Sequence, residues 1–279
     1  MLTTRPAVAL VALLLLGGCS IFAPSKPAEN PGSLPVETLY NRGADALSAR
    51  DFAAAAKQFD YVNQYYPYSP WAANAQLMEG YAQYLQQHYT EGIGTLDNFI
   101  QLHPSSRDIA YAYYLRALCY YEQIEDIQRD QKGTQEAMAA LQEVVSRFPE
   151  SAYARDAKLK IDLARDHLAG KELEIGRFYE REHLYAAALM RFQRVVDDYQ
   201  TTNHVAEALH RLVEIYLKLG MPEEAKRTAA VLGHNYPGSV WYADSYDQLV
   251  ADGLVKGQQV EVPTGDRPGL ISRVFNWLF

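Results

Sequence analysis

Small and large apolar residues recur in a fixed order along most of the chain, in five successive stretches. Each stretch has Gly or Ala at small positions and a larger residue further on, and each ends at a proline or a glutamine. Small residues let two helices approach closely, and large residues fill the space between them. The pattern therefore predicts five packed helix pairs. The positions are Gly43, Ala55 and Phe59 before Pro67; Gly80 and Leu96 before Pro104; Ala137 and Leu141 before Pro149; Gly176, Tyr179, Ala188 and Phe192 before Gln200; and Leu212, Tyr216 and Ala225 before Pro237.

A short motif of the form aromatic-Pro-x-Ser joins each stretch to the next. Proline cannot continue a helix, and a Ser or Thr two residues later can cap the following one. Pro70, directly after Ser69, is expected at the first helical position, where a missing N–H costs nothing. Each copy thus predicts a helix end followed at once by a helix start. The copies are Tyr66–Ser69, His103–Ser106, Phe148–Ser151, Tyr236–Ser239 and the degenerate Tyr199–Thr202.

The spacing of these joints predicts a helical solenoid. Pro67, Pro104, Pro149, Gln200 and Pro237 are separated by 37, 45, 51 and 37 residues. A period near 37 has room for two helices, and one such pair cannot bury its apolar face alone. Alternating apolar runs typical of strands do not occur in this part of the sequence. The spacing resembles the tetratricopeptide repeat (TPR), so we expect an all-α fold: an α-solenoid of five TPR-like helix pairs plus a C-terminal capping helix.

Two longer spacings indicate insertions that divide the chain. Eight extra residues within 122–135 predict a polar loop projecting from the third pair. Fourteen extra residues within 151–182 predict either one long helix or two helices broken near Gly170. This segment joins N-terminal repeats 1–3, residues 35–150, to C-terminal repeats 4–5 and the cap, residues 151–255.

The first residues have the features of an export signal. The apolar stretch of residues 7–18 is too short to span a membrane and follows a single positive charge, Arg5. Leu16-Gly17-Gly18-Cys19 resembles the lipobox of bacterial lipoproteins; an ordinary signal with an incidental cysteine is the alternative. The resemblance implies cleavage after residue 18 and N-palmitoyl and S-diacylglycerol groups on Cys19. The three prolines and few large side chains that follow predict a flexible tether, so that residues 19–34 form the lipidated N-terminus and tether. Ser20, in place of aspartate, favours the outer membrane by the sorting rule of enteric lipoproteins.

Charge and reactive residues argue against nucleic-acid binding and catalysis. The formal net charge is -8, and removing residues 1–18 makes it -9 because only Arg5 is lost. A phosphate-backbone partner would need a basic face. With Cys19 lipidated, Cys119 is the only remaining thiol, which excludes an intramolecular disulfide and fits a small buried hydrophobe. The seven histidines have no helical spacing that would make a metal face, and no catalytic motif occurs. We therefore expect no enzyme activity, cofactor or metal.

Aromatic residues on the first helix of each early repeat predict a peptide-binding groove. Rings in such a groove suit an extended or helical peptide with aromatic side chains. The alternative is that several of them pack between repeats. The later repeats carry arginines instead, Arg177, Arg181, Arg191 and Arg194, which suit an acidic partner surface. The predicted client-peptide groove consists of Tyr40, Met78, Tyr81, Tyr84, Tyr111, Tyr114 and Tyr121.

Residues 256–279 are expected to form a linker and an amphipathic tail. Leu270, Ile271, Val274, Phe275, Leu278 and Phe279 lie near helical spacing. An extended interpretation also exists, because Phe275, Trp277 and Phe279 alternate and resemble the C-terminal signal of outer-membrane β-barrels. This likeness suggests the hypothesis that the tail occupies the aromatic groove in competition with client peptides.

Lipobox, tether and repeats together resemble the BamD (ComL) family of outer-membrane lipoproteins, over residues 13–255. The stretch "FDYVNQYYPYSPWAANAQLMEGYAQY", residues 59–84, carries the resemblance most clearly. It implies a non-enzymatic subunit of the β-barrel assembly (BAM) complex on the periplasmic face of the outer membrane. The implied partners are the POTRA domains of BamA at the C-terminal repeats, other BAM lipoproteins, and unfolded β-barrel proteins at the N-terminal repeats.

Arg191 matches by position a family arginine that faces the POTRA partner, and helical spacing adds Arg194. Two other functions stay open for a chain with this pattern. One is a pilotin-like lipoprotein that escorts secretin subunits, and the other is a periplasmic scaffold for envelope enzymes.

Overall fold

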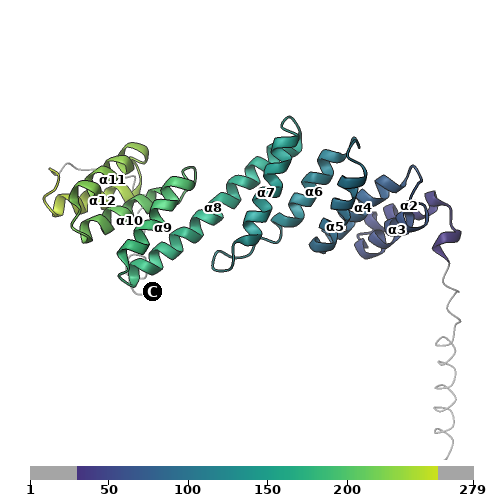
Figure 1. Cartoon of the computed structure of the whole chain (residues 1–279), viewed down its shortest axis with the longest axis horizontal. Coiled ribbons are helices and arrows are strands. Elements are labelled where there is room, and N and C mark those ends of the chain that lie inside the picture. Colours follow the sequence, from purple (N-terminus) through teal and green to yellow (C-terminus); the bar gives the residue numbers. More distant parts are fainter. Residues whose placement is uncertain (1–29, 257–279) are drawn as a thin grey trace, which may run out of the picture. The chain divides into compact units, whose positions relative to one another are not determined.

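The computed structural model describes residues 30–256, and all of its secondary structure is helical (Figure 1). Within this range five helix pairs follow one another and a final helix caps the last pair, which confirms the predicted α-solenoid fold. Cys19, residues 1–18 and the tail from residue 257 onward lie outside the described residues. The elements are η1 (Pro31–Ser33), α2 (Val36–Ser48), α3 (Phe52–Tyr65), α4 (Ala72–Leu85), α5 (Tyr89–Leu102), α6 (Ile109–Tyr121), α7 (Lys132–Arg147), α8 (Ala152–Arg181), α9 (Tyr185–Asp198), α10 (Val205–Lys218), α11 (Pro222–Asn235) and α12 (Val240–Ala251).

The chain forms two compact units, one up to Ala82 and one from Gln83 onward. The core of the first unit packs α2 against α3 and α4 through Leu39, Phe59 and Ala75, none of which is exposed. The second unit contains separate clusters around α6–α8 and around α8–α11, with shared helix α8. None of the described helices is long and apolar enough to cross a membrane.

The pattern of small and large residues reflects close packing between the two helices of a pair. A Cβ atom placed on Gly43 of α2 would lie 2.7 Å from Phe59 of α3, and one on Gly176 of α8 would lie 2.5 Å from Phe192 of α9. Both rings are fully buried. Only glycine allows the ring of the second helix to rest on the backbone of the first, which is the role that the sequence predicted for these residues.

The five joints share one backbone geometry, including the copy without proline. The residue after each second helix has φ between -126° and -134° and ψ between 40° and 54°, and Tyr199, before Gln200, fits this range. Ser151 and Ser239 cap the following helices by accepting from Ala154 and Tyr242 N–H, as predicted. After Ser106 and Thr202 the helices begin later than predicted, with Asp108 and His204 at the N-cap. The prediction for Pro70 is wrong: α4 begins at Ala72, because an additional turn closes between Ala72 N and Ser69 O at 3.1 Å.

The two insertions have different structural consequences. α8 runs without a break for 30 residues. Gly170 does not interrupt it; a Cβ there would lie 3.3 Å from His204 Nε2 at the start of α10, so the glycine allows close packing. The loop between α6 and α7 does not project from the repeats as predicted. It folds against α8, where His167 Nε2 lies 2.8 Å from the backbone oxygen of Glu125.

Candidate functional site

A group of tyrosines in the second unit gathers around α6. We call it the tyrosine cluster; its members come from the end of α4, from α5, from α6 and from the start of α8. The ring of Tyr153 stacks on Tyr114 at 5.2 Å between centroids and lies 5.5 Å from Tyr111. Tyr84 and Tyr89 have centroids 5.9 Å apart. All are partly exposed. The cluster consists of Tyr84, Tyr89, Tyr111, Tyr114, Tyr121 and Tyr153.

Carboxylates and a lysine are interleaved with these rings. The hydroxyl of Tyr114 donates to Asp156 at 2.5 Å, and that of Tyr84 donates to Glu122 at 3.3 Å. Lys160 lies 4.8 Å from the centroid of the Tyr121 ring. Burial and the nearby Glu122 carboxylate raise the pKa of Tyr84 to about 12, and burial with the Asp156 hydrogen bond raises the pKa of Tyr114. The phenols therefore remain protonated donors near neutral pH.

The predicted groove residues divide between the two units. Tyr40, Met78 and Tyr81 lie in the first unit, and all three are half-buried. Tyr40 packs on Phe59 at 5.4 Å and on Trp71 at 4.8 Å, and Met78 contacts the same core. Tyr40 and Met78 therefore contribute to packing between the first and second repeats. The other four, Tyr84, Tyr111, Tyr114 and Tyr121, are the members of the tyrosine cluster on α4 and α6.

The two arginines predicted to bind a partner converge on one carboxylate. Arg191 Nη1 lies 2.9 Å from Glu172 Oε2, and Arg194 Nη1 lies 3.0 Å from Glu172 Oε1. The Glu172 side chain is only 11% exposed, whereas those of Arg191 and Arg194 are 34% and 48% exposed. The bonds to Glu172 raise the pKa of Arg191. One buried carboxylate thus holds two guanidinium groups at the surface, and we call these three residues the arginine pair site.

A pocket of about 440 Å³ opens beside the arginine pair site. One wall is the loop between α6 and α7 together with the start of α7, and the other is formed by α8 and by Arg194 and Tyr199 of the fourth repeat. The inserted loop therefore contributes to the surface around the predicted partner-binding arginines. Nothing in the sequence indicated this neighbourhood, because the loop is some 60 residues away from Arg194 in the chain.

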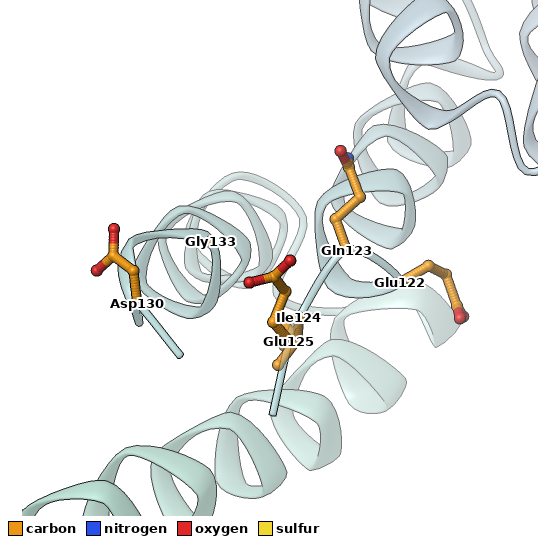
Figure 2. Close-up of a pocket in the computed structure, with 6 residues that line it drawn as sticks. All are labelled: Glu122, Gln123, Ile124, Glu125, Asp130 and Gly133. Carbon is orange, nitrogen blue, oxygen red and sulfur yellow. The ribbon is translucent and has the colours of Figure 1, made fainter. Parts of the chain in front are cut away.

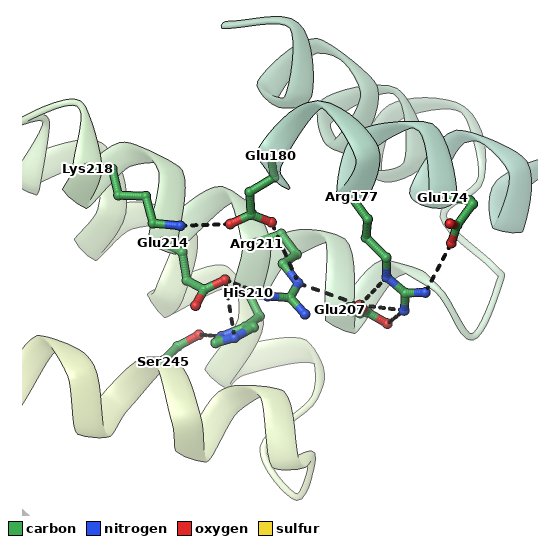
Figure 3. A network of polar contacts seen from close by, with 9 residues as sticks. All are labelled: Glu174, Arg177, Glu180, Glu207, His210, Arg211, Glu214, Lys218 and Ser245. Atoms are coloured by element: carbon green, nitrogen blue, oxygen red, sulfur yellow. Dashed lines mark hydrogen bonds and ion pairs between the residues drawn. The ribbon is translucent and has the colours of Figure 1, made fainter. Parts of the chain in front are cut away.

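The other two arginines singled out from the sequence, Arg177 and Arg181 of α8, are engaged within the protein. Figure 3 shows a charged network in which Nε and Nη2 of Arg177 donate to the carboxylate of Glu207 on α10, at 2.5 to 2.9 Å. Arg181 lies 4.0 Å from Glu174. Glu207 is 8% exposed and also lies 3.6 Å from Arg211. The guanidinium of Arg177 thus joins α8 to α10.

The network continues to a buried histidine. His210 Nδ1 lies 2.8 Å from Ser245 Oγ on α12, and its Nε2 lies 3.7 Å from Glu214 (Figure 3). Burial, together with the positive charge of Arg211, lowers the pKa of His210 to about 4. The imidazole is therefore neutral at neutral pH and ties the capping helix to the fifth pair.

No described residues form a group of three or more side chains that could hold a metal ion. Cys119 is fully buried, and burial raises its pKa to about 12, which confirms its expected role as a small core residue. A second pocket, of about 460 Å³, lies where the loop leaves α6 and is lined by Glu122, Glu125 and Asp130 (Figure 2). These side chains carry no catalytic arrangement.

Several site residues were missed from the sequence. Tyr153, Asp156 and Lys160 are spaced along one face of α8, a helical pattern that could have been recognised as complementary to the α6 tyrosines. Glu122 directly follows α6 and was assigned only to the polar loop. Glu172 carries no local signal, since its importance comes from contact with α9.

Comparison with known proteins shows the family to which this chain belongs. The matching protein family is described as "Outer membrane lipoprotein" (YfiO), and the match covers residues 33–232. A protein of Caulobacter vibrioides named outer membrane protein assembly factor BamD is 48% identical over 90% of this chain and 83% of its own length. This chain belongs to the BamD family.

A second BamD, from Rickettsia prowazekii, is 45% identical over 88% of this chain and 96% of its own length. Among solved structures, the TPR domain of P58(IPK) is similar over 78% of this chain and 56% of that one, with a TM-score of 0.40 and 15% identity. BamD membership associates the chain with the outer membrane. The BamD relatives are named as assembly factors, and the chain is non-enzymatic.

Proposed function

We propose that this chain is a lipid-anchored subunit of the β-barrel assembly machinery on the periplasmic face of the outer membrane. Family membership over most of the chain is the observation that carries this proposal. Cys19 bears the N-palmitoyl and S-diacylglycerol groups after cleavage of residues 1–18. This function requires no cofactor, because binding a client protein and a partner subunit needs only complementary surfaces.

The C-terminal repeats bind a POTRA domain of BamA through the arginine pair site. Two guanidinium groups held at the surface by a nearly buried Glu172 can each donate further hydrogen bonds to carboxylates of a partner. Their geometry is fixed before binding, so little side-chain entropy is lost on association. The adjacent pocket of about 440 Å³ adds room for a partner side chain.

Unfolded β-barrel proteins bind at the N-terminal repeats, with the tyrosine cluster as their main surface in the second unit. Its rings offer faces for aromatic side chains, and aromatic pairs contribute about 0.5 to 1.5 kcal/mol beyond area burial. Tyr84 and Tyr114 keep their protons and hydrogen-bond to carboxylates, which fixes the orientation of the rings. Tyr40, Met78 and Tyr81 of the first unit are proposed to contact the same class of client.

Site-specific photocrosslinking tests the partner assignment. A photoreactive residue replaces Arg191 in the full chain in membranes, and adducts are identified by mass spectrometry. Glu172 keeps Arg194 as its partner in this variant. The matched control carries the same residue at Arg227, an exposed arginine of α11 whose side chain is 72% exposed. We expect adducts with a POTRA-bearing insertase from position 191 only. Adducts with a secretin would instead make the protein a pilotin.

Client binding is tested by affinity for a synthetic peptide ending in alternating aromatic residues. Tyr111→Ala removes a ring of the tyrosine cluster and is expected to weaken binding by roughly tenfold, about 1.4 kcal/mol. Tyr216→Ala, outside the cluster, serves as the control for general loss of a tyrosine. Equal affinities of the Tyr111 variant and the parent chain would contradict the assignment of this surface.

A further inference from the structure

The turns inside the last two repeats differ in chemistry from those inside the first two. Each of these turns has a residue with positive φ directly before the N-cap of the second helix: Arg50, Gln87, His183 and Gly220. The N-cap residues that follow are Asp51 and His88 in the early repeats, but Leu184 and Met221 in the late ones. The four turns therefore share the positive φ before the N-cap, while the side chain at the N-cap changes from polar to apolar.

The apolar caps leave helix ends without a side-chain acceptor. Asp51 accepts a hydrogen bond from Ala54 N–H at 3.0 Å, whereas neither Leu184 nor Met221 makes a side-chain cap. A capping side chain typically contributes about 1 kcal/mol to stability. α5 also lacks this contribution, since His88 makes no side-chain cap, so the late turns differ from the early ones in the apolar character of Leu184 and Met221.

The two turns form one exposed apolar surface. Leu184 is 53% exposed, Leu219 is 43% exposed and Met221 is 39% exposed, and we call these three residues the apolar edge. They lie together because Lys218, next to Leu219, binds both sides of the Leu184 turn. Its Nζ is 2.9 Å from Glu180 Oε1 and 5.5 Å from the centroid of the Tyr185 ring.

The described chain ends close to this edge. Leu254 and Val255 pack against the buried cluster formed by α10, α11 and α12, and so do Tyr216 and Leu217 at the end of α10, immediately before the turn that holds Leu219 and Met221. The hydroxyl of Tyr246 donates to the backbone oxygen of Lys256 at 2.7 Å. This hydrogen bond fixes the position of Lys256, the last described residue.

The continuation carries apolar residues and has sufficient length. Leu270 is the first of the six apolar residues at helical spacing in the tail, and it lies 14 residue steps after Lys256, with 13 residues between them. A segment of that length reaches up to about 46 Å when extended. We propose that residues 270–279 dock on the apolar edge of the same chain and cover Leu184, Leu219 and Met221.

An intramolecular crosslink tests this docking directly. The full chain in membranes carries a photoreactive residue at Met221, and crosslinked peptides are identified by mass spectrometry. The control carries the residue at His88, the equivalent N-cap position of the second repeat. We expect Met221 crosslinks to peptides within 270–279 and none of these from His88. Mixing chains labelled with ¹⁵N and unlabelled chains shows whether the crosslink is within one chain.

A second variant separates docking from folding. Leu184→Asp and Met221→Asp in one chain supply the missing caps, so the helices are stabilised while the apolar edge becomes charged. With the photoreactive residue moved to Leu219, the tail crosslink should be present in the parent chain and lost in the Asp variant, without a decrease in melting temperature. A crosslink that persists in the Asp variant overturns the proposal, as do Met221 or Leu219 adducts with lipid, a second copy or another protein in place of the tail.

Discussion

The tyrosine cluster and the charged network of Figure 3 differ in the charge and the burial of their polar groups, although α8 contributes to both. Around α6 the polar atoms are phenols at a half-buried surface, and the rings remain partly open to solvent. Between α8 and α10 the polar groups are ions that pair with one another, Glu207 is almost fully buried, and the neutral pair His210 and Ser245 links α10 to α12. The two regions therefore differ in accessibility: the rings of the tyrosine cluster reach solvent, whereas the ions of the later repeats are engaged in contacts between helices.

Removing one ion from the network should have the largest effect. Glu207→Ala leaves Arg177 and Arg211 without their shared carboxylate in a nearly buried site. We expect a loss of about 3 kcal/mol in the free energy of unfolding, at the low end for a broken buried pair, because Arg177 keeps Glu174 and Arg211 keeps Glu214 as partners. Urea denaturation of the full chain measures it.

The matched control for that variant is Glu223→Ala. Its carboxylate pairs with Lys226 in an exposed position on α11, and its removal should leave the denaturation midpoint unchanged. A Glu207 variant as stable as this control would mean that the network contributes nothing to the fold.

Acid should weaken the same region through His210. Its folded pKa of about 4 lies below the unfolded value near 6.5, so the unfolded state binds the proton more readily. The contribution of His210 to the free energy of unfolding is complete above pH 6.5. About 3 kcal/mol of it is lost as the pH falls toward 4.

The groups around His210 must be separated from its own titration. The positive charge of Arg211 lowers the pKa of His210, whereas the carboxylates of Glu180, Glu207 and Asp244 act in the opposite direction and Glu214 lies 3.7 Å from His210 Nε2. The measurement is therefore the slope of unfolding free energy between pH 6.5 and 5, with His210→Gln as the comparison. An unchanged slope in that variant would contradict a role for His210.

A smaller effect is expected in the tyrosine cluster. Tyr114→Phe keeps the ring on Tyr153 but removes the hydroxyl that donates to Asp156. We expect a loss of about 1 kcal/mol, because the group is only half-buried and water can solvate Asp156. Thermal unfolding measures it, and Tyr121→Phe is the control, since the Lys160 contact there uses the ring. Equal losses in the two variants would show that the Asp156 bond is not significant.

The smallest change concerns the ionisation of Tyr84. Burial is the main cause of its pKa near 12, and Glu122 is the second. Glu122→Gln should lower that pKa without returning it to 10, as followed by NMR of ¹³C-labelled tyrosine. A pKa that does not move would mean that the Glu122 carboxylate does not act on Tyr84.

Sequence periodicity was sufficient for the fold, because the determinants are local. Gly43 beneath Phe59 and Gly176 beneath Phe192 are contacts within one helix pair, and their spacing can be read along the chain. Joint geometry also follows from short-range sterics, as the joint at Tyr199 shows without a proline. The start of α4 was misplaced since an extra turn after Ser69 has no distinct signal.

The sequence by itself determined the helix pairs, the buried Cys119 and the residue types available at each surface. Only the tertiary structure decided which of these residues are free to bind. It turned Arg177 toward Glu207, brought Arg191 and Arg194 to one carboxylate, and folded the inserted loop onto α8. The physical reason is that an ion pair between helices depends on distance in space, which helix stacking sets and which local spacing does not encode.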